Sequence, residues 1–167
     1  VFPDCRLKHK PCVSVLMPCL NAEPYLREAV ASVLSQAECL ELLVADGGSS
    51  DGSLSILQEL ATKDARLRIV SHTDEGPADA LNRAFHAVRG TLIGWLNADD
   101  LYNSGSLARA KLALRQHPEW LMVYGEGMEF NATTGLLQRY PTSPPEVGIR
   151  GFLSHCLDRK STRLNSS

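Results

Sequence analysis

The chain alternates short apolar runs with longer segments in which apolar residues recur every three or four positions. Short runs of this kind are typical of buried strands, and the longer spacing is typical of amphipathic helices. The first strand is predicted at residues 13–17, closed by Pro18, and a helix follows from the 21–24 segment to about residue 36. Three further strand–helix pairs are predicted, with strands at 40–45, 67–71 and 91–96 and helices at 54–60, about 78–90 and 105–116. This alternation predicts an α/β fold, with a mostly parallel sheet that carries helices on both faces.

The C-terminal part departs from that alternation. A fifth strand is predicted at 120–124, and two short strands at 127–130 and 136–140 predict an antiparallel hairpin that makes the sheet mixed. A proline-rich loop follows, and residues 158–167 have no apolar period, so we expect this tail to be disordered and foreign to the domain. The expected domain covers residues 1–157.

Two of the predicted strands end in acidic residues. Strand 40–45 leads into Asp46, and strand 91–96 leads into Asp99 and Asp100. The carboxyl ends of parallel strands meet at one edge of a sheet, where open sheets bind ligands. Adjacent carboxylates repel each other, and a divalent cation, a sugar hydroxyl or a donor-rich loop offsets that cost. A second interpretation stays open, in which Asp99 and Asp100 are turn and N-cap residues for the following helix.

Three other features allow more than one interpretation. The glycine-rich segment after Asp46 is suited to donate backbone N–H groups to a phosphate, and equally to form an ordinary turn. Asp79 lies near the start of the third helix, where an acid interacts favourably with the helix dipole or contributes to a donor site. Trp95 lies within an apolar strand and is expected in the core.

Composition narrows the functional class. The chain has 167 residues, 44% of them hydrophobic, and a net charge of −2 without a dense Lys/Arg block, which argues against nucleic-acid binding. No apolar run reaches the roughly 20 residues that span a bilayer, and no signal peptide is evident, so a cytoplasmic location without a transmembrane segment is expected. The five cysteines form no Cys-x-x-Cys pair, which favours reduced thiols over disulfides or structural zinc.

Four segments in order carry a family resemblance. They are VSVLMPCLNAEPYLREAVASVLSQ, ELLVADGGSSDGS, DEGPADALNRAF and GWLNADDLYNSGSL. Over roughly residues 13–140 the chain resembles family 2 glycosyltransferases, inverting enzymes with the GT-A-type nucleotide-diphospho-sugar transferase fold. The resemblance implies a nucleotide pocket lined by Pro18, Asn21 and Asp46, with Asp79 as a further donor-site candidate. It also implies a DXD-type element in which Asp99 faces the ribose or diphosphate and Asp100 coordinates Mn²⁺ or Mg²⁺.

Two departures from the family pattern limit what the resemblance implies. Gly47 stands where many members carry a second acid, so the contacts of that acid, including base selection, do not transfer. The family's general base lies well downstream of the DXD-type element, and no residue here matches it, so the chain resembles a truncated donor-binding portion with the base beyond its end.

The resemblance implies a metal-dependent inverting glycosyltransferase. It would move a sugar from a nucleotide-diphospho-sugar to a hydroxyl of a glycan, a lipid-linked or another acceptor. One alternative is a non-catalytic fragment that binds nucleotide-sugar. Another is a Rossmann-type dinucleotide enzyme, which is disfavoured because PCLNAEP follows the first strand where G-x-G-x-x-G would be required.

Overall fold

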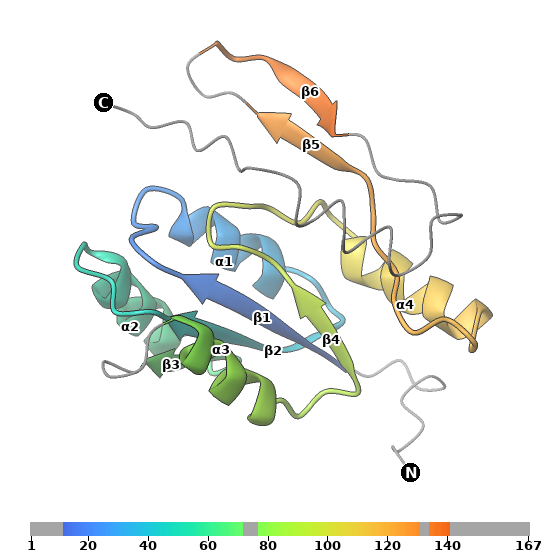
Figure 1. The fold of residues 1–167 in the computed structure, drawn as a ribbon, viewed down its shortest axis with the longest axis horizontal. Coiled ribbons are helices and arrows are strands. Elements are labelled where there is room, and N and C mark those ends of the chain that lie inside the picture. The colour runs from blue at the N-terminus through green and yellow to red at the C-terminus, as the bar shows by residue number, and fades with distance from the viewer. Residues whose placement is uncertain (1–11, 72–76, 131–133, 141–167) are drawn as a thin grey trace. The chain divides into compact units, whose positions relative to one another are not determined.

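The computed structural model describes residues 12–71, 77–130 and 134–140, and the chain divides into two compact units, Val1–Val123 and Tyr124–Ser167. The first unit is built on a four-stranded parallel sheet with the order β3-β2-β1-β4 (Figure 1). Its strands are β1 (Val13–Cys19), β2 (Cys39–Asp46), β3 (Leu67–Ser71) and β4 (Leu92–Trp95). The predicted parallel α/β fold is therefore confirmed, and β1 extends two residues beyond its predicted end, with Pro18 inside the strand.

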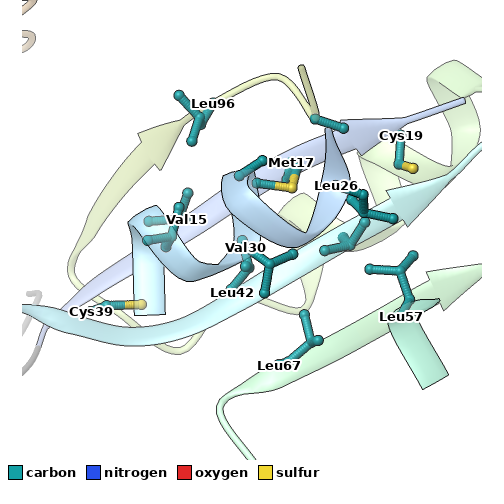
Figure 2. Packing of buried hydrophobic residues seen from close by; sticks show 14 of the residues in the cluster. Val15, Met17, Cys19, Leu26, Val30, Cys39, Leu42, Leu57, Leu67 and Leu96 are labelled. Carbon is teal, nitrogen blue, oxygen red and sulfur yellow. The ribbon is translucent and has the colours of Figure 1, made fainter. Parts of the chain in front are cut away.

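Helices cover both faces of this sheet. They are α1 (Leu26–Leu34), α2 (Ser53–Lys63), α3 (Pro77–His86) and α4 (Ser106–Gln116). On one face, side chains of β1 such as Val15 and Met17 pack against Leu26 and Val30 of α1 and Leu57 of α2 (Figure 2). On the other face, a smaller cluster joins the sheet to α3, with these buried members: Leu16, Leu43, Ala45 and Ala84. Successive residues of a strand face opposite sides, which is why β1 supplies both clusters.

The edge strand β4 is more exposed than predicted. Leu16 pairs with Trp95, so both side chains point to the face that α3 covers over β1, β2 and β3. Helix α3 packs on β1, β2 and β3 but has few contacts with β4. The side chains of Ile93 and Trp95 on β4 are therefore 46% and 53% exposed. The prediction that β4 is fully buried and that Trp95 belongs to the core is therefore wrong. An apolar sequence creates the capacity for burial, but a packing partner is also needed.

The strand predicted at 120–124 is also absent from the structure. Residues 120–124 have no strand conformation, and Leu121 is 92% exposed. The sequence there is apolar enough for a strand, but within the described residues no other strand supplies hydrogen-bond partners for its backbone.

The second unit contains the predicted hairpin, β5 (Gly127–Phe130) and β6 (Leu137–Tyr140), with antiparallel pairing from Gly127↔Tyr140 to Phe130↔Leu137. It forms a sheet of its own, so the expected mixed sheet is wrong. The predicted proline-rich loop and the 158–167 tail lie outside the described residues. In the described part of the chain, no helix is both long enough and apolar enough to cross a bilayer.

Candidate functional site

Asp46 ends β2 and organises the loop that follows it. Its side chain is almost fully buried, and Oδ2 accepts hydrogen bonds from the backbone N–H groups of Gly48 and Ser49, both at 3.2 Å. Oδ1 accepts a hydrogen bond from Ser49 Oγ at 2.5 Å, and the N–H of Gly47 donates to the carbonyl of Cys19 at 2.9 Å. These loop N–H groups thus already donate hydrogen bonds to acceptors of the protein itself. They support the ordinary-turn interpretation of the glycine-rich segment rather than the phosphate-binding one.

The β2–α2 loop is joined to the β1–α1 loop by Asn21. The N–H of Asn21 donates to Ser49 Oγ at 3.0 Å, and Asn21 Oδ1 accepts from the N–H of Ser50 at 2.8 Å. Next to this pair, the N–H of Ala22 donates to the buried Ser53 Oγ at 2.9 Å. Asn21 has a φ of 52°, a left-handed conformation that asparagine tolerates better than most residues. The two loops consequently form one hydrogen-bonded unit at the carboxyl edge of the sheet.

The acidic loop after β4 lies at the same edge and is anchored at several points. The N–H of Leu96 donates to the carbonyl of Leu16 on β1 at 3.1 Å, and Ala98 is buried. Tyr102 Oη donates to the carbonyl of Trp95 at 2.8 Å, and the N–H of Tyr102 donates to Ser32 Oγ on α1 at 3.1 Å. The loop is therefore held to both β1 and α1.

Asp99 and Asp100 stand on this anchored loop with exposed side chains. Helix α4 begins after Gly105, whose φ is 72°, so neither aspartate caps it and the N-cap part of the second interpretation is wrong. Its turn part is confirmed, because the N–H of Asp100 donates to the carbonyl of Asn97 at 3.1 Å. Partial dehydration of the carboxyl group raises the pKa of Asp100 above its ordinary value. A hydrogen bond from Asn97 opposes this rise, and the charge of Asp99 adds to it. Two adjacent carboxylates repel each other, and a bound cation offsets that repulsion.

The carboxylates of Asp99 and Asp100 suit a cation whose remaining ligands are water and substrate oxygens. Among the described residues, no three His, Cys, Asp or Glu side chains converge as a complete metal site. Mg²⁺ and Mn²⁺ prefer oxygen ligands, and Mg²⁺ commonly takes one or two carboxylates, several waters and phosphate oxygens of a substrate. Asp99 and Asp100 supply that chemistry, and none of the described ion pairs contains either of them.

The other predicted site residues are placed as follows. Pro18 lies near the end of β1 and is partly buried, so it borders the same edge as Asp46. Asp79 falls in the first turn of α3, and only its backbone position is described. Four further polar residues, His72, Glu146, His155 and Asp158, lie outside the described residues.

Sequence reasoning missed a buried polar network at the opposite end of the sheet. The Glu41 side chain is completely buried in β2 and accepts hydrogen bonds from Ser14 Oγ at 2.6 Å and Arg68 Nη1 at 2.7 Å. It also accepts from the backbone N and Nε of Arg89, at 2.7 and 2.8 Å. Burial raises the pKa of Glu41, but these hydrogen bonds outweigh it and lower the pKa to about 2. A charged residue within the apolar run LELLVA was the available signal.

Comparisons with known sequences place this chain in a family. The sequence profile described as Glycosyl transferase family 2 matches residues 14–153. The chain is 37% identical over 123 residues to the O-antigen biosynthesis protein RfbC of Myxococcus xanthus, covering 71% of this chain and 10% of that protein. It is also 37% identical over 120 residues to a PGL/p-HBAD biosynthesis glycosyltransferase of Mycobacterium bovis, covering 70% of this chain and 46% of that protein.

Solved structures resemble the same part of the chain. TarS 1-349 of S. aureus, in complex with UDP, has a TM-score of 0.57 and 26% identity, covering 64% of this chain and 33% of that one. The mannosyltransferase PcManGT of Pyrobaculum calidifontis, in complex with GDP-Man and Mn²⁺, has a TM-score of 0.57 and 28% identity, covering 65% of this chain and 33% of that one. This chain therefore spans about a third of each of these two solved structures.

Proposed function

Because the chain belongs to glycosyl transferase family 2, we propose that it supplies the nucleotide-sugar donor site of a metal-dependent, inverting glycosyltransferase. The observation that carries this proposal is the exposed pair Asp99 and Asp100, on a loop anchored at the carboxyl edge of the sheet. Support comes from TarS, which is solved with UDP, and from PcManGT, which is solved with GDP-Man and Mn²⁺. A Rossmann-type dinucleotide enzyme is set aside because the family profile covers most of the chain.

The residues at this edge have distinct roles in the proposal. Asp100 would hold Mn²⁺ or Mg²⁺, which when bound stabilises the negative charge of the leaving diphosphate. Asp99 would contact the ribose or the diphosphate. The joined loops that contain Pro18, Asn21 and Asp46 would form the wall of the nucleotide pocket, because their mutual hydrogen bonds hold them in one arrangement. Asp79 remains a candidate on the donor side.

The reaction needs a second component beyond the donor site. Inversion by direct displacement requires the acceptor hydroxyl to lose its proton as it attacks the anomeric carbon, and a positioned general base contributes about 10²–10⁴-fold to such a step. We assign no described residue to that role and place the base downstream, toward the acceptor. The acceptor would be a hydroxyl of a glycan, of a lipid-linked sugar or of another molecule.

The cellular location that we propose is the cytoplasm. Cys19 and Cys39 are free thiols, and both are buried. Reduced cysteines are typical of cytosolic proteins, in which thiols are kept out of disulfides. This supports the proposed location without depending on the metal or the nucleotide.

Calorimetry with a panel of UDP- and GDP-sugars, with Mn²⁺ and with EDTA, tests the proposal. We expect at least one donor to bind in a Mn²⁺-dependent way. Asp100→Ala should abolish the gain from Mn²⁺, and Asp99→Ala should weaken binding less. Glu28→Ala, which removes an exposed acid from α1, is the matched control and should leave the affinity unchanged. An unchanged Mn²⁺ gain in Asp100→Ala would overturn the metal assignment.

A measurement of turnover separates the enzyme from its non-catalytic alternative. Donor hydrolysis and transfer to acceptors are measured for the same protein preparation that binds donor. Binding with negligible turnover, both in the chain as given and in residues 1–157, would identify a donor-binding portion. Rapid turnover by residues 1–157 would instead place the general base within that range.

A further inference from the structure

A chain of side-chain hydrogen bonds runs from the edge strand to the proposed metal ligand. Trp95 Nε1 donates to Asn97 Oδ1 at 3.2 Å, and Asn97 Nδ2 donates to Asp100 Oδ2 at 3.0 Å. The oxygen of the Asn97 carboxamide thus faces a hydrogen-bond donor, and its nitrogen faces an acceptor. A flipped amide would place its NH₂ group against the indole N–H and its oxygen against the carboxylate, so only one orientation satisfies both neighbours.

The backbone around this chain is independently held. The N–H of Asp100 donates to the carbonyl of Asn97 at 3.1 Å, which closes a turn. The carbonyl of Trp95 accepts a hydrogen bond from Tyr102 Oη at 2.8 Å. The same hydroxyl packs closely against Gly94, since a Cβ added there would lie 3.3 Å from its oxygen. Because the backbone of the turn is anchored, the main remaining freedom is the orientation of the Asp100 side chain.

We propose that Trp95 and Asn97 are positioning residues, which orient the Asp100 carboxylate for a divalent cation that binds together with a nucleoside diphosphate. Asn97 donates to Oδ2 of Asp100, which leaves Oδ1 available to a cation. The indole N–H holds the oxygen end of the Asn97 amide, so the NH₂ end stays toward Asp100. This inference rests on the proposed donor site and adds to it two residues that do not themselves contact the metal.

The exposure of Trp95 agrees with this role. With 53% of its surface exposed, its ring gains less from burial than a core tryptophan would, yet its N–H group has a specific acceptor two residues away. Leucine at this position would cover the strand equally well but would remove one of the two contacts that fix the orientation of the Asn97 amide. The positioning role therefore depends on the N–H group rather than on the hydrophobic area of the side chain.

The expected effect is moderate. Residues that orient a metal ligand typically change metal affinity by about 10–100-fold when they are replaced. Asp99 and Asp100 are exposed here and water competes for their oxygens, so we expect the lower end, about 10-fold, for Asn97→Leu. Trp95→Phe keeps an aromatic ring but removes the pyrrole ring with its N–H group, while Asn97 still contacts Asp100, so it should cause a smaller loss in the same direction.

The test measures UDP and GDP affinity, with Mn²⁺ and with EDTA, in the wild type, Asn97→Leu and Trp95→Phe. Asn103→Leu is the matched control, since Asn103 is an exposed asparagine of the same loop. We expect unchanged affinity in EDTA for all four proteins. The gain from Mn²⁺ should fall about 10-fold in Asn97→Leu, less in Trp95→Phe and not at all in Asn103→Leu. A purely structural role would lower both affinities together.

Nuclear magnetic resonance gives a second, metal-free readout. The chain has 2 tryptophans, so the two indole N–H signals can be assigned with Trp95→Phe. In the Asn97→Leu protein the Trp95 indole proton should exchange with water faster and change its chemical shift, and the Trp120 indole signal should stay in place. An unchanged Trp95 signal would show that its N–H does not bind Asn97 and would overturn the inference.

The binding outcomes separate this inference from the donor-site proposal. Wild-type protein that gains no affinity from Mn²⁺ would overturn both. A wild type that does gain affinity, with equal gains in Asn97→Leu and Trp95→Phe, would overturn the positioning role and leave the donor site standing. Loss of the gain in both variants, with affinity in EDTA retained, would support both.

Discussion

Glu41→Gln should lower the free energy of unfolding by about 3 kcal/mol at pH 7. The pKa of Glu41 is about 2 in the folded protein against an ordinary value of 4.5, and each pKa unit corresponds to about 1.4 kcal/mol. Glutamine keeps the shape but has one oxygen where glutamate has two. Each glutamate oxygen accepts two hydrogen bonds. Oε1 accepts from Ser14 Oγ and the backbone N–H of Arg89, and Oε2 accepts from Arg68 Nη1 and Arg89 Nε. Either amide orientation therefore turns an NH₂ group toward donors.

The pH dependence provides a second signature of the same charge. Because the folded pKa lies below the unfolded pKa, the contribution of Glu41 is fully present above about pH 5 and is lost as the pH falls from about 4.5 toward 2. Urea denaturation, followed by circular dichroism at a series of pH values, measures this. The difference in stability between the wild type and Glu41→Gln should be constant near neutral pH and should shrink in acid.

Glu59→Gln is the matched control for burial. Hydrogen bonds from Arg27 and Lys63 lower the pKa of Glu59 to about 2 as well, but its side chain is 43% exposed. Exposed ion pairs contribute little because water and salt screen them, so this variant should lose far less stability. A loss below about 1 kcal/mol for Glu41→Gln, or equal losses in the two variants, would refute the reasoning from burial.

Three further changes test other parts of the structure. In Gly90→Ala the new Cβ would lie 2.5 Å from the Cys12 carbonyl oxygen and 2.7 Å from the Ser14 nitrogen, so a destabilisation of about 1–3 kcal/mol is expected in urea denaturation; stability equal to the wild type would show that the backbone yields there. Asp46→Asn should weaken nucleoside diphosphate binding, measured by calorimetry, without changing the Mn²⁺ requirement. Normal nucleotide affinity with a higher Mn²⁺ requirement would mean that Asp46 serves the metal and that the assignments of Asp46 and the Asp99–Asp100 pair are reversed. Burial raises the pKa of Cys39 to about 11, so a thiol reagent at pH 8 should label it slowly in native protein and rapidly in urea, as peptide mass spectrometry can measure; fast labelling without urea would contradict its burial.

Local sequence patterns predicted the central strands and the helices that cover them. The runs VSVLM and LELLVA became β1 and β2, and the apolar spacing of α1 places Leu26, Ala29, Val30 and Val33 against the sheet. These predictions succeeded because each depends on periodicity within one element. The hairpin was found in the same way, from two strand-like runs around a turn.

Features that depend on distant partners were missed or wrong. Trp95 has the sequence context of a core residue, but its exposure is decided by where α3 packs. The partners of Glu41 lie up to 48 positions away, so the sequence offered the buried charge but not its neighbours. The acidic residues at the strand ends were found because parallel topology alone brings strand ends to one edge. The roles of Asp46, Asp99 and Asp100 in binding remain predictions.

Paramagnetic mapping with a Mn²⁺–nucleoside diphosphate complex tests the central claim most directly. Mn²⁺ broadens the nuclear magnetic resonance signals of nearby backbone amides, so the affected residues locate the bound metal. The account predicts broadening at Ala98–Leu101 and around Asn21 and Ser49, and none at Glu41 or Arg89 at the other end of the sheet. Broadening centred on the amino edge of the sheet, or none at the Asp99–Asp100 loop in protein that binds the complex, would contradict it.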